Sequence, residues 1–188
     1  IMLQSTIHVG IGLIFALSGP ADKTDITEGV LDLTSVQLTD YETIDLSGEW
    51  AFYWNRFLQD NEGSTQDSAD PGQPRPAILV PVPGVWNHVE IDGQSLPGFG
   101  YGTYRLTVVG AVPGEKLALR IDSVSTAFSL FLDGQLIAQS GQISQSPAGF
   151  VPYNRSQIVE FDVPAAEFDL FVQIANFSYA RGGFWTPF

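Results

Sequence analysis

Aromatic, amide and guanidinium side chains near the loops could bind a carbohydrate. Flat aromatic rings stack on the C–H-rich faces of pyranose sugars, while planar amide and guanidinium groups pair with neighbouring hydroxyl groups. Both types occur near predicted loops or strand ends, at Trp86, Tyr101, Tyr153, Asn176, Arg181 and Trp185. The alternative for Trp86 and Trp185 is a role in packing, and Arg181-Gly182-Gly183 could equally form a bend in the chain.

Catalytic side chains are harder to assemble from this sequence. Acid–base hydrolysis needs two carboxylates in one cleft, with separated pKa values. The acidic candidates all sit where strand ends and turns ordinarily carry acids: Glu49, Glu90, Asp92 and Asp122. Cysteine is absent, the histidines are His8 and His88, and no serine lies in a nucleophile-elbow pattern. We therefore expect this chain not to be an enzyme.

A metal site is one interpretation of the segment His88-Val89-Glu90-Ile91-Asp92. Alternate side chains of an extended segment share a face, so His88, Glu90 and Asp92 could converge on one ion. The alternative is a polar rim on a loop. No calcium-loop pattern is present. We expect neither a metal ion nor any other cofactor.

The charge of the chain limits its partners. The formal net charge is −13, and the lysines are Lys23 and Lys116. Such a surface repels the phosphate backbone of nucleic acids and anionic lipid headgroups. Nucleic acid is therefore not an expected partner, whereas uncharged sugars, cations and basic partners remain open. The absence of cysteine is compatible with a periplasmic location.

Alternation of apolar and polar residues predicts short strands, each with one face on a core. The predicted strands are residues 49–54, 77–82, 104–108, 117–121, 128–132, 135–139, 157–163 and 168–177. Residues 60–76 are acidic, small and proline-punctuated, which is typical of a surface loop. With no strong amphipathic helix, these strands predict an all-β fold, a two-sheet antiparallel jelly-roll sandwich.

Individual residues sharpen this fold prediction. Asp133-Gly134 is typical of a two-residue turn that joins two antiparallel strands. Trp50, Phe52 and Trp54 are expected in the core. Arg105 points outward from its predicted strand, so we expect it to pair with a carboxylate.

The first residues carry a different pattern. Residues 1–21 hold no charge, and an apolar run at 11–17 is followed by the small residues Gly19-Pro20-Ala21. This indicates a signal or leader segment without its usual basic start, too short to span a bilayer. The alternative is a buried strand or helix. The expected organisation is a leader over 1–21 and a single jelly-roll ectodomain over 22–188.

Five blocks in order carry a resemblance to known families. They are LSGEWAFYW at 46–54, VPVPGVWN at 80–87, GYGTYRL at 100–106, residues 127–141 with LDGQ, and IANF at 174–177 followed by RGGFWTP at 181–187. The order resembles the N-terminal sugar-binding jelly roll of glycoside hydrolase family two. It is more similar to the related ectodomain of bacterial seven-transmembrane receptors with diverse intracellular signalling modules.

The spacing in the last block separates the two relatives. The resemblance covers residues 29–188 and implies a galactose-binding-domain-like fold. In the hydrolases an insertion normally parts the asparagine strand from the glycine–aromatic segment, but here only residues 177–180 separate Asn176 from Arg181. That spacing is similar to the receptor form. Asp133 stands where both relatives usually have asparagine, so we draw no ligand contact from that position.

The resemblance implies a periplasmic sensor domain, attached to the inner membrane, that binds a carbohydrate-like or other small ligand. Its output would be a histidine kinase or a nucleotide cyclase. The expected partners are the ligand, the membrane-embedded remainder of the same chain and, as an option, a second copy in a homodimer. The alternatives are a non-catalytic sugar-binding accessory domain of a secreted glycoside hydrolase and a protein-contact or dimerisation domain.

Overall fold

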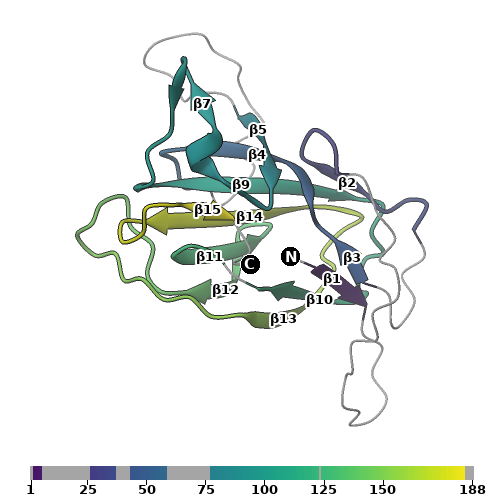
Figure 1. Ribbon diagram of the computed structural model, residues 1–188. Coiled ribbons are helices and arrows are strands. Elements are labelled where there is room, and N and C mark those ends of the chain that lie inside the picture. Colours follow the sequence, from purple (N-terminus) through teal and green to yellow (C-terminus); the bar gives the residue numbers. More distant parts are fainter. Residues whose placement is uncertain (1, 6–25, 37–42, 59–76, 123, 185–188) are drawn as a thin grey trace.

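The structure is an antiparallel β-sandwich, as the sequence predicts. The computed structural model describes residues 2–5, 26–36, 43–58, 77–122 and 124–184. The larger sheet has seven strands, in the order β12 (Gln135–Ser140), β11 (Ala127–Leu132), β14 (Glu167–Asn176), β9 (Gly100–Val109), β4 (Gly48–Trp54) and β5 (Ile78–Val82), with β2 (Val30–Asp32) parallel to β9. All-β architecture and the two-sheet arrangement are thereby confirmed (Figure 1).

The second sheet covers the apolar face of the first. Its four strands are β13 (Gln157–Asp162), β10 (Lys116–Ile121), β1 (Met2–Ser5) and β3 (Thr43–Asp45). Two small ribbons complete the fold, β15 (Gly183–Phe184) with β6 (Gly84–Val85), and β7 (Glu90–Ile91) with β8 (Gln94–Ser95). A short 3₁₀ helix, η2 (Trp86–His88), lies between β6 and β7. No helix among the described residues has the length and apolar character needed to cross a membrane.

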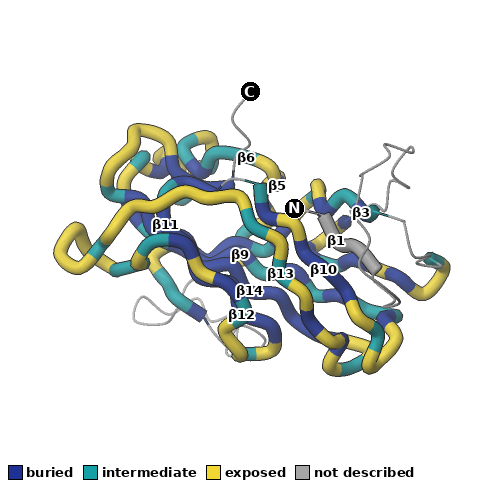
Figure 2. Tube along the Cα trace, turned by 90° about the horizontal axis from the view of Figure 1, so that it is seen from below, coloured by how far each residue is buried: buried dark blue, intermediate teal, exposed yellow. Residues whose placement is uncertain are grey.

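The core between the two sheets follows the predicted alternation. Leu106 and Val108 of β9 are buried, as are Trp50 and Phe52 of β4, whereas Trp54 is partly exposed at the edge of this core. Figure 2 shows the buried strands inside and the exposed loops at both ends. The alternation therefore predicted the buried faces of the central strands correctly, because one side of each strand faces the core.

Strand β9 is longer than the sequence indicated. It begins at Gly100, whereas the alternation begins at Tyr104. All ten residues of β9 pair with β14, from Gly100 opposite Asn176 to Val109 opposite Glu167. Glycine weakens a strand locally, but pairing with a long neighbour overrides that preference.

Arg105 has the carboxylate partner that its outward position predicts. Its Nε and Nη2 atoms donate to the two oxygens of Asp169 on β14, at 3.0 and 2.8 Å, and the Thr107 hydroxyl donates to the same carboxylate at 2.6 Å. Burial by itself lowers the pKa of Arg105, but the hydrogen bond and the charge of Asp169 raise that pKa overall. The guanidinium also lies 5.8 Å from the ring centre of Phe171. A charge pair thus links the two central strands on the outer face of the large sheet.

The start of the chain joins the smaller sheet. Backbone pairing places β1 between β10 and β3. Residues 6–21 of the expected leader lie outside the described residues. The division into a leader over 1–21 and a domain over 22–188 therefore stays a prediction.

The predicted hairpin at Asp133-Gly134 is confirmed. Both residues have positive φ, 43° and 81°, and they connect β11 to β12. The turn is also tied to β14, because the backbone N–H of Asp133 donates to the carbonyl of Asp169 and the Asp133 carboxylate accepts from the Asp169 N–H at 2.8 Å. The turn therefore holds the edge of the sheet against its centre.

The first prediction concerns this turn. Gly134→Val should lower the free energy of unfolding by about 1 kcal/mol or more, because a β-branched residue is strained at positive φ. Urea denaturation measures the change. Gln135→Val is the matched control, since this exposed neighbour already lies in a strand. Equal stability of the two variants would show that the turn does not require glycine.

Candidate functional site

The side-chain amide of Asn176 organises one end of the sandwich. Asn176 is the last residue of β14 and is fully buried. Its Nδ2 donates to the carbonyls of Gly98 at 2.8 Å, Tyr179 at 2.7 Å and Arg181 at 3.3 Å. Its Oδ1 accepts from the Thr126 hydroxyl and from the backbone N–H groups of residues 178 and 179. The expectation that Asn176 contacts a ligand is therefore wrong, because protein groups use both ends of its amide.

Residues 177–182, which we call the Asn176 loop, wrap around this amide. Asn87 fastens the loop from outside, since its Nδ2 donates to the Ala180 carbonyl at 3.2 Å and its Oδ1 accepts from the Gly182 N–H at 3.2 Å. The loop passes so close to Gly98 that a Cβ there would lie 2.1 Å from the Ala180 carbonyl oxygen. Contacts from two other segments thus fix the path of the loop.

Trp86 is a core residue and not a surface platform. It is 1% exposed, its indole N–H donates to the Pro97 carbonyl at 2.9 Å, and its ring centre lies 5.2 Å from that of Trp54. Gly182 of the Asn176 loop lies against the indole, where an added Cβ would come within 2.1 Å of the ring. The expectation that Trp86 binds a ligand is therefore wrong, because helix η2 turns the side chain inward.

Exposed aromatic rings lie on the segments that the buried amide holds. Phe99 follows Gly98 and is 55% exposed, and Tyr179 of the Asn176 loop is 47% exposed. Their neighbours form two ring contacts, Phe57 with Tyr101 at 4.9 Å and Phe150 with Phe177 at 5.4 Å. We call this set the aromatic rim: Phe57, Phe99, Tyr101, Phe150, Phe177 and Tyr179. Figure 1 shows its loops together at the left end, where β9 begins and β14 ends.

Three of the other predicted binding residues, Tyr101, Tyr153 and Arg181, belong to the described part of the chain, and Trp185 does not. Tyr101 belongs to the rim and is partly exposed. Tyr153 is 56% exposed, and its backbone N–H donates to the carbonyl of Thr126. Arg181 is exposed at the end of the Asn176 loop. Trp185 lies outside the described residues, so its predicted role stays a prediction.

Sequence reasoning missed Phe99 and Tyr179, the rim residues next to the Asn176 carbonyl partners. Neither belongs to an alternating strand pattern. A usable signal was present for Phe99, because an aromatic residue between Gly98 and Gly100 has no regular strand to bury it. For Tyr179 the signal was weaker, since only its position in a short loop marks it.

The acidic candidates lie on separate elements of the described residues. Glu49 lies on β4 and Glu90 on β7, and Asp122 follows β10 and pairs with Arg120 at 2.7 Å. His88 belongs to helix η2, so it does not continue an extended segment with Glu90. Nowhere in the described part of the chain do three or more metal-ligating side chains cluster. The interpretation of 88–92 as a metal site is not supported.

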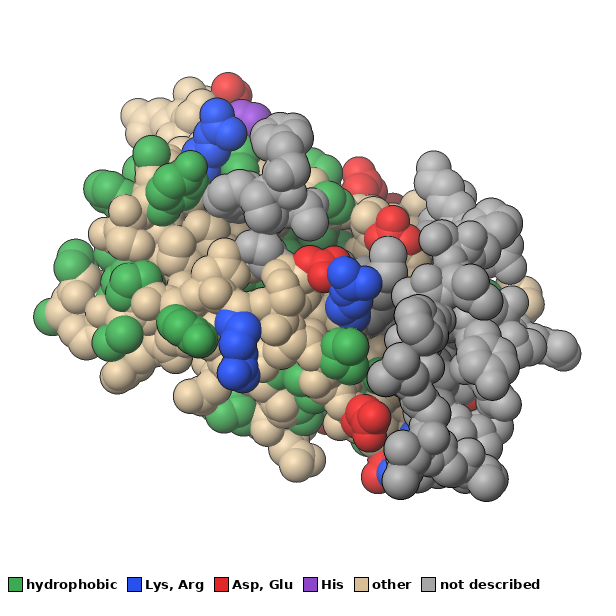
Figure 3. Space-filling view, turned by 60° about the horizontal axis from the view of Figure 1, so that its bottom comes forward, with side chains coloured by type: hydrophobic (Ala, Val, Ile, Leu, Met, Phe, Trp, Pro, Cys, Tyr) green, Lys and Arg blue, Asp and Glu red, His purple; other side chains and the backbone are tan. Residues whose placement is uncertain are grey.

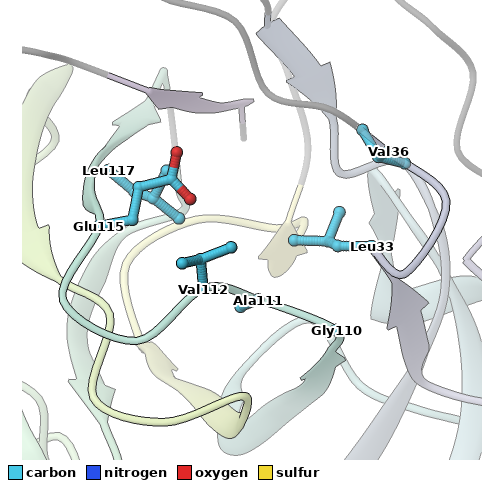
Figure 4. A pocket seen from close by; sticks show the side chains of 7 residues that line it. All are labelled: Leu33, Val36, Gly110, Ala111, Val112, Glu115 and Leu117. Atoms are coloured by element: carbon cyan, nitrogen blue, oxygen red, sulfur yellow. The ribbon is translucent and has the colours of Figure 1, made fainter.

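A cavity lies at the opposite end of β9 from the rim. Its volume is about 250 Å³, and its lining is Leu33, Val36, Gly110, Ala111, Val112, Glu115 and Leu117. Figure 4 shows Glu115 and Leu117 on one side and Leu33 and Val36 on the other. Five of the lining side chains are purely hydrocarbon, and Glu115 supplies the one polar side chain of the lining. A smaller space of about 80 Å³ beside Trp86 has no room for a sugar.

Comparisons with known proteins give a distant structural likeness. Comparison with protein-family models and with curated proteins found no match. Similar solved structures include Faecalibacterium prausnitzii β-glucuronidase (24% identity, TM-score 0.43, 71% of this chain and 20% of that one) and GH2 β-galacturonidase from Eisenbergiella tayi bound to galacturonate (19%, 0.46, 72% and 21%). Lactobacillus rhamnosus β-glucuronidase is a third (22%, 0.41, 70% and 20%).

This chain spans about a fifth of the length of those enzymes. The galacturonidase is a GH2 enzyme, the family whose N-terminal domain the sequence resembles. Likenesses this distant say nothing about activity or ligand.

The second prediction tests the buried amide. Asn176→Asp replaces the donating Nδ2 with an oxygen that faces three carbonyls, so the free energy of unfolding should fall by at least about 3 kcal/mol at neutral pH. The introduced carboxyl should have a raised pKa in the folded state, since burial and the carbonyls disfavour its charged form. Part of the stability should therefore return as the pH falls and the carboxyl becomes protonated.

Gln139→Glu, at an exposed position on β12, is the control for added negative charge. Urea denaturation across a pH series measures both variants relative to the wild type. A loss for Asn176→Asp no larger than that of the control would contradict the role given to the amide.

Proposed function

We propose that this chain is a non-catalytic binding domain that holds a carbohydrate-like ligand on the aromatic rim. The observation that carries the proposal is the exposure of Phe99 and Tyr179 on segments whose backbone the Asn176 amide fixes. Exposed aromatic rings are the usual platforms for sugar stacking. The hydrogen bonds of the buried Asn176 amide hold the backbone beside these rings, so the rings stay exposed and the loops do not collapse onto the core.

A rigid backbone beside Phe99 and Tyr179 favours binding at this rim. A ligand that orders a flexible loop loses affinity to the conformational entropy of that loop. The carbonyls of Gly98 and Tyr179 are already held by one amide, so the two neighbouring rings start from fixed anchor points. The exposed side chain of Arg181, two residues after Tyr179, is the nearest charged group along the chain that could pair with ligand hydroxyl or acidic groups.

The rim suits binding and not turnover. Its six members are aromatic residues without a carboxylate among them. The candidate acids lie on β4, on β7 and after β10, and Asp122 is already paired with Arg120. A hydrolase needs two carboxyl groups on either side of one bond, and the rim residues themselves supply none.

We further propose that the domain works outside the cytoplasm as the sensor of a membrane-attached signalling receptor. The support is the sequence resemblance and the short path from Asn176 to β15. Tyr179 on the rim is only a few residues from Gly183, whose carbonyl accepts from the Ser125 N–H and whose strand pairs with β6. One short segment of the chain thus connects the proposed ligand site at the rim to strand β15. A ligand would act through it only by binding two states of that segment with different affinity.

An accessory sugar-binding domain of a secreted glycoside hydrolase would use the same rim. The sequence that follows this domain in the full-length protein distinguishes the two roles, because a receptor continues into membrane spans and a hydrolase into a catalytic barrel. A protein-contact or dimerisation role is the remaining alternative. It would bury Phe99 and Tyr179 against another chain instead of a sugar.

The third prediction tests the rim. Phe99→Ala and Tyr179→Ala should each weaken binding of the oligosaccharide found by a glycan-array screen by more than about tenfold, because an aromatic hot spot contributes about 2 kcal/mol or more. Melting temperatures should stay near that of the wild type, since both side chains are exposed. Calorimetric titration measures affinity, and Leu79→Ala is the matched control because Leu79 is similarly exposed on β5.

Unchanged affinity in both rim variants would place the sugar elsewhere. Absence of any sugar ligand, together with loss of self-association in the same variants, would favour the dimerisation role.

The fourth prediction concerns catalysis. The isolated domain should release no product from aryl-glycosides, because the candidate acids Glu49, Glu90 and Asp122 lie on separate elements of the described fold. A sensitive fluorogenic assay with the purified chain measures this. Turnover that disappears in Glu49→Ala, Glu90→Ala or Asp122→Ala would show that the chain is an enzyme after all.

A further inference from the structure

The cavity at the end of β9 combines a hydrocarbon lining with one carboxylate. Its volume is about 250 Å³, whereas protein interiors contain few voids larger than a water molecule. Leu33, Ala111 and Leu117 are buried in its wall, and Val112 is 62% exposed at its surface side. Glu115 is partly buried beside Leu117, across the cavity from Leu33 (Figure 4). The space therefore suits a small ligand that is mostly hydrocarbon and has one polar group.

Backbone hydrogen bonds hold the walls of this cavity in place. The Leu33 N–H donates to the carbonyl of the last residue of β9 at 2.8 Å, and the Glu115 carbonyl accepts from the Val163 N–H at 2.9 Å. Gly110 has a φ of 77°, and a Cβ there would come within 2.5 Å of the Thr34 nitrogen on the other wall. A ligand therefore enters a preformed space and loses little affinity to ordering of the chain.

The charged residues around the cavity are mostly acidic. The lining segments 32–36 and 110–117, and the segment 162–167 that is hydrogen-bonded to them, carry four acids and one base: Asp32, Glu115, Asp162, Glu167 and Lys116. Lys116 pairs with Asp162 at 2.8 Å, and its side chain points away from the cavity because it alternates with Leu117 on β10. Figure 3 shows acidic side chains mainly on the right of the molecule, the end at which β9 terminates. The local potential therefore favours a cation.

We infer that this cavity binds a primary alkylamine, with the alkyl chain among the hydrocarbon side chains and the ammonium group paired with Glu115. An apolar cavity of about 150 Å³ accepts benzene, so the larger cavity here accommodates a linear chain of about six carbons. Glu115 also interacts elsewhere in the chain. An ionised carboxylate accepts about four hydrogen bonds, so it can receive an ammonium group as well. The inference uses no residue of the aromatic rim and does not rest on carbohydrate binding.

The head group of the ligand sets the order of affinity. A carboxylate on the same alkyl chain would lie against Glu115, and like charges at short distance repel. An alcohol of the same length gains the same burial of hydrocarbon but forms no ion pair. The length of the chain sets the strength of binding, because each buried CH₂ group contributes about a fourfold gain in affinity. Amine should therefore bind above alcohol, and alcohol above carboxylate.

The fifth prediction tests the cavity by NMR titration of the labelled chain with hexylamine, hexanol and hexanoate at neutral pH. Hexylamine should shift the amide signals of Leu33, Val112 and Glu115 saturably, and hexanoate should not. Butylamine should bind more than about tenfold more weakly than hexylamine, because it buries two fewer CH₂ groups. Glu115→Gln should weaken hexylamine binding about fivefold and leave hexanol binding unchanged, since it removes only the ion pair. Glu49→Gln is the control for the lost charge, because Glu49 is exposed on β4 outside the lining.

A filled cavity gives a second test. Ala111→Leu places a larger side chain in the lining and should abolish hexylamine binding, with melting temperature as the check on folding. If that variant does not fold, the comparison of hexylamine with hexanol in Glu115→Gln decides the matter. No saturable shift at the cavity, hexanoate binding as tight as hexylamine binding, or equal losses in Glu115→Gln and Glu49→Gln would overturn the inference. Phe99→Ala should leave amine binding unchanged, which separates failure of this inference from failure of the carbohydrate proposal.

Discussion

The buried amide of Asn176 is the interaction on which the candidate site depends. A polar group removed from water must be hydrogen-bonded inside the protein, and leaving it unpaired costs about 1–3 kcal/mol. The Asn176 amide forms hydrogen bonds with three segments. Its nitrogen donates to carbonyls before β9 and within the Asn176 loop. Its oxygen accepts from the Thr126 hydroxyl and from the backbone at the start of the loop. The segments before β9, before β11 and after β14 are therefore held at one point. The exposed positions of Phe99 and Tyr179 follow from that arrangement.

The other end of the Asn176 loop is fixed by aromatic packing. Phe184 of β15 lies 5.7 Å from Trp50 and 5.4 Å from Tyr104, measured between ring centres, and all three rings are buried. Burial raises the pKa of Tyr104 far above its usual value, although a hydrogen bond to the backbone of Phe184 opposes the shift. The hydroxyl therefore stays protonated and tied to β15.

Sequence predicted the parts of this structure that local patterns decide. The core faces of β9 and β14 follow from alternation, the Asp133-Gly134 turn from the two residues that accept positive φ, and the Arg105 pairing from an outward position on a buried strand. It failed where residue type is ambiguous. Tryptophan and asparagine suit both a sugar site and a buried network, so nothing in the sequence distinguished Trp86 and Asn176 as structural residues. The β7–β8 ribbon, which turns at Asp92-Gly93 with φ of 54° and 75°, carries the same local signal as the predicted hairpin but lacks the long alternating flanks.

The proposed binding end and the cavity lie at opposite ends of β9, about 30 Å apart at 3.3 Å per residue. NMR titration of the labelled chain with a panel of oligosaccharides tests this arrangement most directly, because the amide signals report both ends in one experiment. We predict that one sugar of the panel shifts the amide signals of Phe99, Tyr179 and Arg181 together and leaves those of Leu33 and Val112 at the cavity unchanged. Shifts confined to the cavity, or no shift with any sugar, would contradict binding at the rim.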